Sequence, residues 1–404
     1  MTSATGLPEE TITAFAYDPQ TGNLLTTTDP LGHATTLRSD AAGNVVAATD
    51  ATLRTTAFAY DAKNRLTAVT DAAGGTTRYA YDEASNLTRV TDATGRPTTF
   101  TYDPLGQLTR VTNPAHETRQ FAYDLARHLA RVEDATGQRL EFTYDAAGQL
   151  TQKRSTDGLG AVQETVGFSY FPSGDLQRVS DRDSTLGFRY DFEGRLVEAT
   201  TGDVATPGLP QPVTTLTSRY TLLGDRQTLA DSASGRTLCF RHDEFRGVLN
   251  AITEDPTCAG HLVILGHDPL RRRTGQSLAS ASFVEPFVVS SQWTYDAASQ
   301  LTSLNHTHAG LSLARSTYTY DPVGNRTTLT DLLGLHTFTY DRLNRLTQAD
   351  HPLASTLADE AFTYDAVGNR LTSHLSASHT HDVANRLLED DTFTYTYDAN
   401  GNLT

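Results

Sequence analysis

A Tyr-Asp pair recurs along almost the whole chain, and this repeat constrains the fold more than any other feature. The pairs begin at Tyr17, Tyr60, Tyr81, Tyr102, Tyr123, Tyr144, Tyr190, Tyr295, Tyr320, Tyr340, Tyr364 and Tyr397. Between Tyr60 and Tyr144 the step is always 21 residues. Degenerate copies occupy the remaining intervals, which gives about seventeen consecutive units of roughly 20 residues. Such a chain is expected to fold as a repeat array.

Each unit carries two turn signals. Asp103, Pro104 and Gly106 occupy the first, second and fourth places of one tetrapeptide, and these are the residues that a type I turn prefers there. The aspartate is expected to accept hydrogen bonds from the backbone ahead of it, and proline presets φ. The second turn of a unit has the same form, as at Asp29 to Gly32.

The segments between the turns are typical of short strands. Residues 98–102 and 108–112 are rich in Thr, Val, Phe and Tyr. Because tight turns join antiparallel neighbours, the units predict an all-β fold, a continuous antiparallel meander of hairpins with very little helix. An open twisted sheet rarely exceeds about ten strands without curling. The meander should therefore curl into a spiral β-shell or a barrel-like tube.

Leu108 and Val111 depart from strict alternation, because residues three apart fall on opposite faces of a regular strand. A β-bulge beside the turn would place both side chains on one face.

Residues 1–404 are predicted to form a single repeat array, with inserted loops near 201–215 and 278–292. The first of these stretches is rich in proline and glycine, and the repeat resumes after both. The sequence runs to Thr404 inside a repeat. We expect no effector domain, and interpret the chain as a fragment, a truncated product or one member of a split system.

Composition excludes several classes of function. The 48 acidic residues outnumber the 32 lysines and arginines, giving a net charge of −16, which argues against a nucleic-acid partner. Residues 1–10 lack the features of a signal peptide, and no stretch reaches the roughly 20 apolar residues of a membrane span. Cys239 and Cys258 could form a disulfide or remain two buried thiols, so they do not fix the redox compartment.

Several copies of the unit resemble one known repeat closely: residues 144–151 (YDAAGQLT), 320–331 (YDPVGNRTTLTD) and 364–372 (YDAVGNRLT). The pattern is similar to the YD repeat of the Rhs family, which also occurs in Tc toxin B and C components and in teneurins. The resemblance implies a hollow β-shell that encloses a C-terminal toxic domain, often released by self-cleavage after a core motif. No such motif follows Tyr397.

The repeat signature itself is expected to be structural, because an aspartate that opens a turn is explained by its backbone bonds. Its best copies are Tyr60, Asp61, Tyr81, Asp82, Tyr102, Asp103, Tyr123, Asp124, Tyr144, Asp145, Tyr320, Asp321, Tyr340, Asp341, Tyr364 and Asp365. No copy has an adjacent base or nucleophile, and no common cofactor motif is present. We therefore expect no catalytic residue and no cofactor.

Two groups of histidines could in principle bind a transition metal, because imidazoles two residues apart on a strand share a face. They are His306 with His308, and His374, His379 and His381. Asp181 with Asp183, and Asp390 with Asp391, could likewise attract calcium. Surface histidines and surface charge explain these residues more simply, so we expect no metal site.

The leading hypothesis is a non-enzymatic shell or scaffold module of an Rhs-type secreted toxin or surface protein. Its partner would be an enclosed toxin or effector polypeptide, or further repeats of the same protein. The alternative is a cell-surface adhesion module that binds carbohydrate, with Trp293 and Tyr295 as a possible stacking platform. The resemblance implies a secreted or cell-surface location.

Overall fold

The structure is a computed structural model that describes residues 13–203, 214–242, 248–254, 263–278, 289–397 and 403–404. All regular secondary structure in these ranges is β, and none of these residues forms a helix. None of them therefore belongs to a helix that could cross a membrane.

The strands are short and follow one another closely. The first 22 are β1 (Ala14–Tyr17), β2 (Leu24–Thr28), β3 (Ala34–Ser39), β4 (Val45–Thr49), β5 (Thr55–Tyr60), β6 (Leu66–Thr70), β7 (Thr76–Tyr81), β8 (Leu87–Thr91), β9 (Pro97–Tyr102), β10 (Leu108–Thr112), β11 (Thr118–Tyr123), β12 (Leu129–Glu133), β13 (Arg139–Tyr144), β14 (Leu150–Thr156), β15 (Val162–Tyr170), β16 (Leu176–Ser180), β17 (Ser184–Tyr190), β18 (Leu196–Asp203), β19 (Thr214–Tyr220), β20 (Arg226–Asp231), β21 (Thr237–His242) and β22 (Leu249–Thr253). The others are β23 (Val263–His267), β24 (Arg273–Leu278), β25 (Val289–Tyr295), β26 (Leu301–His308), β27 (Leu311–Tyr320), β28 (Arg326–Thr330), β29 (Leu335–Tyr340), β30 (Leu346–Asp350), β31 (Glu360–Ala361), β32 (Thr363–Tyr364), β33 (Arg370–Thr372), β34 (Thr380–His381) and β35 (Leu387–Glu389).

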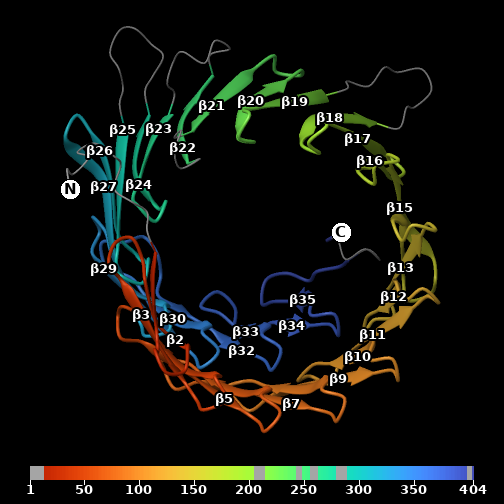
Figure 1. Cartoon of the computed structure of the whole chain (residues 1–404), viewed down its shortest axis with the longest axis horizontal. Coiled ribbons are helices and arrows are strands. Elements are labelled where there is room, and N and C mark those ends of the chain that lie inside the picture. Colours follow the sequence, from red (N-terminus) through yellow and green to blue (C-terminus); the bar gives the residue numbers. More distant parts are fainter. Residues whose placement is uncertain (1–12, 204–213, 243–247, 255–262, 279–288, 398–402) are drawn as a thin grey trace. The chain divides into compact units, whose positions relative to one another are not determined.

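Successive strands pair with one another in antiparallel fashion. In one stretch β5 pairs with β6, β6 with β7 and β7 with β8, and the same order holds along most of the ribbon (Figure 1). Strands β1 to β31 belong to one sheet of 31 strands, whereas β32–β33 and β34–β35 form two small sheets. The predicted all-β antiparallel meander is confirmed.

The predicted bulge beside the turn is also confirmed. Tyr81 pairs with Leu87 and Ala80 pairs with Arg89, so Thr88 is the extra residue. The Thr88 hydroxyl donates to the Ala80 carbonyl at 3.2 Å, which stabilises the extra residue across the strand pair. The same register shift precedes Tyr60, Tyr123, Tyr144, Tyr190, Tyr320 and Tyr340.

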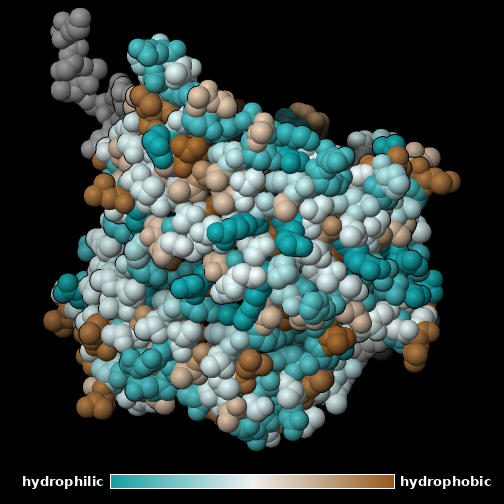
Figure 2. Space-filling model, turned by 90° about the horizontal axis from the view of Figure 1, so that it is seen from below, coloured by the Kyte–Doolittle hydropathy of each residue, from teal (hydrophilic) through white to brown (hydrophobic). Residues whose placement is uncertain are grey.

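The ribbon has very little conventional core. Among the described residues the buried apolar side chains are Cys239, Ala251, Leu265, Ala349 and Phe362. Most strand residues are half-buried. The face seen in Figure 2 mixes polar and apolar side chains, with apolar ones protruding singly. Repeated contacts between neighbouring strands must therefore supply most of the stability.

The chain divides into two compact units, each assembled from segments that are distant in sequence. Unit 1 contains Met1–Thr99, Val263–Tyr364 and Thr372–Leu375; unit 2 contains Phe100–Leu262, Asp365–Leu371 and Ser376–Thr404. The loops predicted near 201–215 and 278–292 fall mainly on 204–213 and 279–288, which lie outside the described residues. Cys239 is fully buried and disulfide-bonded. Cys258, like the two loops, lies outside the described residues.

The meander gives the ribbon two different edges. Turns that follow a tyrosine, such as Asp61 to Asn64, join an odd-numbered strand to the next even-numbered one and lie along one edge, here called the YD rim. The alternate turns, such as Asp50 to Leu53, usually follow a threonine and lie along the opposite edge, here called the TD rim. Each rim is a row of tight turns.

Within unit 1 the YD rim of β25–β30 meets the TD rim of β3–β8. Arg54 Nη1 donates to Gln300 Oε1 at 3.1 Å, across 246 positions of sequence. Val323 from a YD turn and Asp71 from a TD turn line the same cavity, of about 490 Å³. The ribbon therefore returns onto its own earlier strands, and it does so through unlike rims.

The bond between Arg54 and Gln300 should be measurable as a coupling energy. A double-mutant cycle of Arg54→Ala and Gln300→Ala should give about 0.5–1.5 kcal/mol, because one side-chain hydrogen bond is lost in both single variants. Urea unfolding of the four proteins measures this energy. The matched pair Arg54→Ala and Gln107→Ala should be additive, since Gln107 belongs to unit 2. Additive effects in the first cycle would contradict the rim contact.

Candidate functional site

The aspartates of the Tyr-Asp pairs organise the turns that follow them. Asp61 Oδ1 accepts the N–H groups of Lys63 at 2.8 Å and Arg65 at 3.0 Å, and Asp61 Oδ2 accepts Arg65 Nε at 2.8 Å. The predicted bonds to the backbone ahead are thereby confirmed. Oδ1 also accepts the N–H four residues ahead at Asp82, Asp103, Asp124, Asp145, Asp321, Asp341 and Asp365.

The fourth residue of most of these turns has a positive φ. It is 78° at Gly106, which lacks the Cβ that makes this region costly. Asn64 and Ser85 take the same place at 60° and 71°. This is the geometry of a turn that closes on a glycine-type bulge, and it explains why glycine and asparagine recur there.

These hydrogen bonds favour the charged carboxylates. The backbone N–H of Arg65 is the main group that holds the pKa of Asp61 below its usual value. At Asp82 the side-chain amide of Asn86 lowers the pKa in the same way. Hydrogen bonds to the ionised form account for both shifts, as in any well-formed turn.

The tyrosine hydroxyls connect each unit to the one before it. Tyr81 donates to the Leu66 carbonyl at 2.9 Å, and Leu66 is the first residue of the strand that follows the preceding YD turn. Equivalent bonds join Tyr60 to Val45, Tyr123 to Leu108, Tyr144 to Leu129, Tyr320 to Leu301, Tyr340 to Arg326 and Tyr364 to Leu346. Tyr102 ends β9 at the corresponding position. We call this repeated contact the tyrosine clamp.

A basic or amide side chain extends the clamp along the YD rim. The Arg65 guanidinium lies 4.8 Å from the Tyr81 ring centroid, and Arg65 Nη1 donates to the Asp82 carbonyl at 2.9 Å. Arginines cover Tyr220, Tyr295, Tyr364 and Tyr397 in the same manner. The phenol, the carboxylate and the following cation are therefore all engaged in holding the backbone. This arrangement positions chain segments.

The histidines considered as metal ligands have separate environments. His306 Nδ1 lies 2.7 Å from the Ser291 hydroxyl, and His379 Nδ1 lies 3.4 Å from the Leu371 carbonyl. The described part of the chain contains no group of three or more His, Cys, Asp or Glu side chains arranged to hold a metal ion.

The structure brings together two other histidines that sequence reasoning missed. His336 is buried, the side chain of His351 is only 7% exposed, and their Nδ1 atoms lie 2.7 Å apart. His336 Nε2 is 3.3 Å from Asp331, and His351 Nε2 is 3.9 Å from Glu360. The pairing of Thr337 with Asp350 places the two histidines opposite each other across the hairpin. The two histidines lie on opposite sides of the turn after Tyr340, at similar distances from it in sequence. This spacing could have indicated the contact.

Trp293 and Tyr295 lie on the same face of β25, because they are two residues apart. Arg273 lies 5.8 Å from the Trp293 ring, and the Tyr295 hydroxyl donates to the Arg273 carbonyl at 2.7 Å. Arg272 lies 4.7 Å from the Tyr295 ring. An arginine side chain therefore lies over each of the two rings. The sugar platform at this position stays a prediction.

Comparison with known proteins identifies the repeat. The family model of the teneurin YD-shell matches residues 9–132, and that of the RHS repeat matches residues 123–159. Residues 9–159 are therefore similar to YD-repeat proteins. Beyond the matched part, Tyr-Asp pairs with the same turns continue through β30 and the small C-terminal sheets. No curated protein matched the chain in sequence.

Solved structures share the fold of this YD-repeat chain. The crystal structure of TcdB2–TccC3 is 15% identical, has a TM-score of 0.64 and covers 97% of this chain. The Photorhabdus luminescens Tc holotoxin pore is 14% identical, has a TM-score of 0.66 and also covers 97%. The chain spans only 25% and 24% of those chains, respectively. At this identity the likeness shows the fold.

Removal of one clamp hydroxyl should weaken the ribbon locally. Tyr81→Phe should lower the free energy of unfolding by about 1 kcal/mol, because the bond to the Leu66 carbonyl is lost. Urea unfolding followed by circular dichroism measures the change. Tyr190→Phe is the matched control, since the Tyr190 hydroxyl has no hydrogen bond within the described part of the chain. Equal effects of the two substitutions would contradict the clamp.

Acid should weaken the turns. The pKa of Asp61 is lower in the folded chain than its ordinary value of 3.8, so the unfolded chain binds the proton more tightly. The resulting stability is complete above about pH 5 and is lost as the pH falls through the folded pKa. Thermal unfolding measured between pH 2 and 6 should show this loss of stability. In Asp61→Asn the stability should depend less on pH over the same range.

Asn113 shows that the substitution keeps the turn. Its Oδ1 accepts the N–H groups of Ala115 at 3.0 Å and Glu117 at 2.9 Å without a charge. Asp61→Asn should therefore fold at neutral pH. If this variant loses stability in acid as much as the wild type does, the turn carboxylate is not the cause of the acid sensitivity, and the prediction is wrong.

Proposed function

We propose that this chain is a structural module of a YD-repeat shell, and that the shell encloses a partner polypeptide of the toxin or effector type. The observation that carries the proposal is the likeness of fold over 97% of the chain to the TcdB2–TccC3 structure. The similar holotoxin pore, which also contains TccC3, is a toxin assembly by its name. A secreted or cell-surface location belongs to the same proposal.

The chemistry of the repeats supports a structural role. The tyrosines and aspartates described above are engaged in hydrogen bonds that fix turns and neighbouring strands. The faces of the ribbon carry mainly half-buried threonine, alanine and valine side chains, with few buried apolar residues. A thin sheet of this kind can confine another polypeptide without a deep pocket of its own.

Protection from protease tests enclosure. The chain is co-expressed with the polypeptide encoded next to it, purified as a complex and treated with trypsin. We expect the partner to survive in the complex for at least about tenfold longer than the free partner, because proteolysis requires access to an extended segment. A partner cleaved at the same rate with and without the chain would overturn the proposal.

The order of mixing supplies the control. If the ribbon encloses its partner, the partner must be present while the ribbon folds. Partner added to the folded chain should therefore remain sensitive to trypsin. Protection that develops equally on late addition indicates ordinary surface binding, which contradicts enclosure.

A further inference from the structure

Among the described residues, unlike rims meet in both units. In unit 1, Val323 and its YD turn meet the TD turn at Asp71, and Arg54 bonds to Gln300. In unit 2, the YD-type turn residues Val383–Asn385 line one cavity together with Asn113–Glu117 of the TD rim. Because the two contacts use different sequences, they define a general mode in which a YD turn docks on TD turns.

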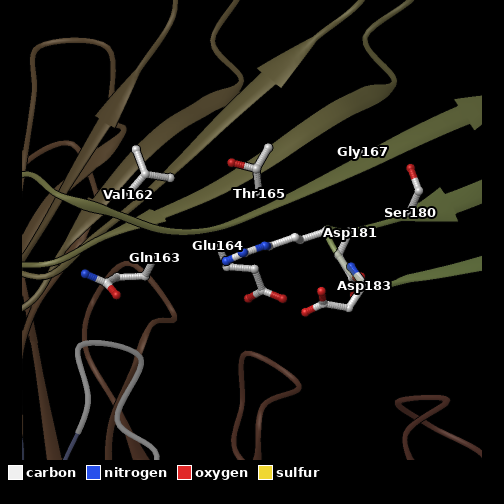
Figure 3. Close-up of a pocket in the computed structure, with 9 residues that line it drawn as sticks. Val162, Gln163, Glu164, Thr165, Gly167, Ser180, Asp181 and Asp183 are labelled. Carbon is white, nitrogen blue, oxygen red and sulfur yellow. The ribbon is translucent and has the colours of Figure 1, made fainter. Parts of the chain in front are cut away.

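The TD rim of unit 2 continues past that contact, and among the described residues no YD turn lines the next two cavities. A second cavity, of about 500 Å³, is lined by Phe121, Leu140 and Val166, and it shares Phe121 with the first. A third cavity, of about 690 Å³, follows between β15 and the turn at Asp181, and it shares Glu164 with the second. Glu164 and Asp183 point toward the same opening in Figure 3. We call this continuous stretch the open TD groove.

The other half of the contact is also exposed on unit 2. Its YD turns carry large apolar side chains at their tips: Leu105 is 63% exposed, Leu125 107%, Phe192 96% and Leu222 105%. The apolar turn residues in the two internal contacts are less exposed: Val323 in unit 1 is half-buried, and Val383 in unit 2 is 52% exposed. We call the four exposed residues the apolar tips.

The first YD turns of unit 1 provide a contrast. Their third residues are Ala42, Lys63 and Ala84, which are small or charged. In unit 1 the YD turn at Asp321 brings Pro322 and Val323 to the contact, whereas the turn at Asp296 brings only Ala298. The exposed leucine and phenylalanine tips of unit 2 are larger than either, and together they form an apolar row on the YD rim.

We propose that the open TD groove of one molecule receives the apolar tips of a second copy of this chain. The contact is heterologous, since the two partners use different rims, and each added copy leaves one groove and one set of tips free. The chains therefore associate head to tail by the contact that the ribbon already makes with itself. This inference concerns self-association and does not depend on an enclosed partner.

Salt should strengthen this association. Each copy carries a net charge of −16, so two copies repel each other at low ionic strength, whereas the tips contribute apolar contact. Screening shortens the range of the repulsion to about 8 Å at physiological salt and about 3 Å at 1 M. Association that weakened steadily with salt would point to charge pairing and would contradict docking of the tips.

Sedimentation velocity on the full chain tests the proposal. The wild type should form dimers and longer species as its concentration rises. Leu125→Asn with Leu222→Asn removes two tips, and Thr165→Arg fills the groove from β15; each variant should associate at least about tenfold more weakly. All three substituted residues are exposed, so the folded chain should tolerate the changes.

Mixing the two variants distinguishes this interface from general stickiness. The tip variant retains a groove and the groove variant retains tips, so an equimolar mixture should regain association but stop at dimers. Leu53→Asn is the matched control, because Leu53 is 83% exposed on the TD rim of unit 1 and should not affect association. A monomeric wild type at high concentration, variants that associate normally, or a mixture that fails to pair would each overturn the proposal.

Discussion

The hydrogen bond that most of the repeat tyrosines donate to a backbone carbonyl one unit earlier is the contact on which the ribbon depends. The Leu66 carbonyl, which Tyr81 reaches, begins a strand just after a YD turn. Here one strand carries an extra residue, and the bulge directs the following side chains. The clamp therefore ties the irregular part of one unit to the end of the next.

This arrangement explains how a chain with so little buried apolar surface can hold a defined structure. Each unit contacts mainly its neighbours, as in other repeat proteins, so stability is a sum over similar local interfaces. Asp61 and Arg65 show how much of each interface is polar: the carboxylate fixes the turn, and the guanidinium covers the next tyrosine. Aspartate and arginine side chains of the kind that often take part in catalysis are here engaged in contacts that hold turns and neighbouring strands.

Local features could be predicted from the sequence because each unit contains their cause. The turns at Asp103 and Asp29, and the bulge expected from Leu108 and Val111, depend on residues a few positions apart. The contact of Arg54 with Gln300 could not be predicted in the same way, since similar units leave open which unit meets which. His336 and His351 were overlooked because both fall outside the repeat signature. The sugar platform at Trp293 was predicted only from the presence of an aromatic residue. The residue type alone does not show that an arginine side chain lies over the ring.

The two rims connect the local chemistry to the larger role proposed for the chain. Unlike rims meet inside both units, and the tips and grooves that remain on unit 2 have the same character.

The direct measurement of the central claim is hydrogen–deuterium exchange along the intact chain. If the clamp supports every unit, slow-exchanging amides should recur with the 21-residue period from β5 to β14, including the amide of Asp61, which bonds the Arg65 carbonyl at 3.0 Å. Protection limited to a few buried strands, with free exchange in the other repeats, would contradict it.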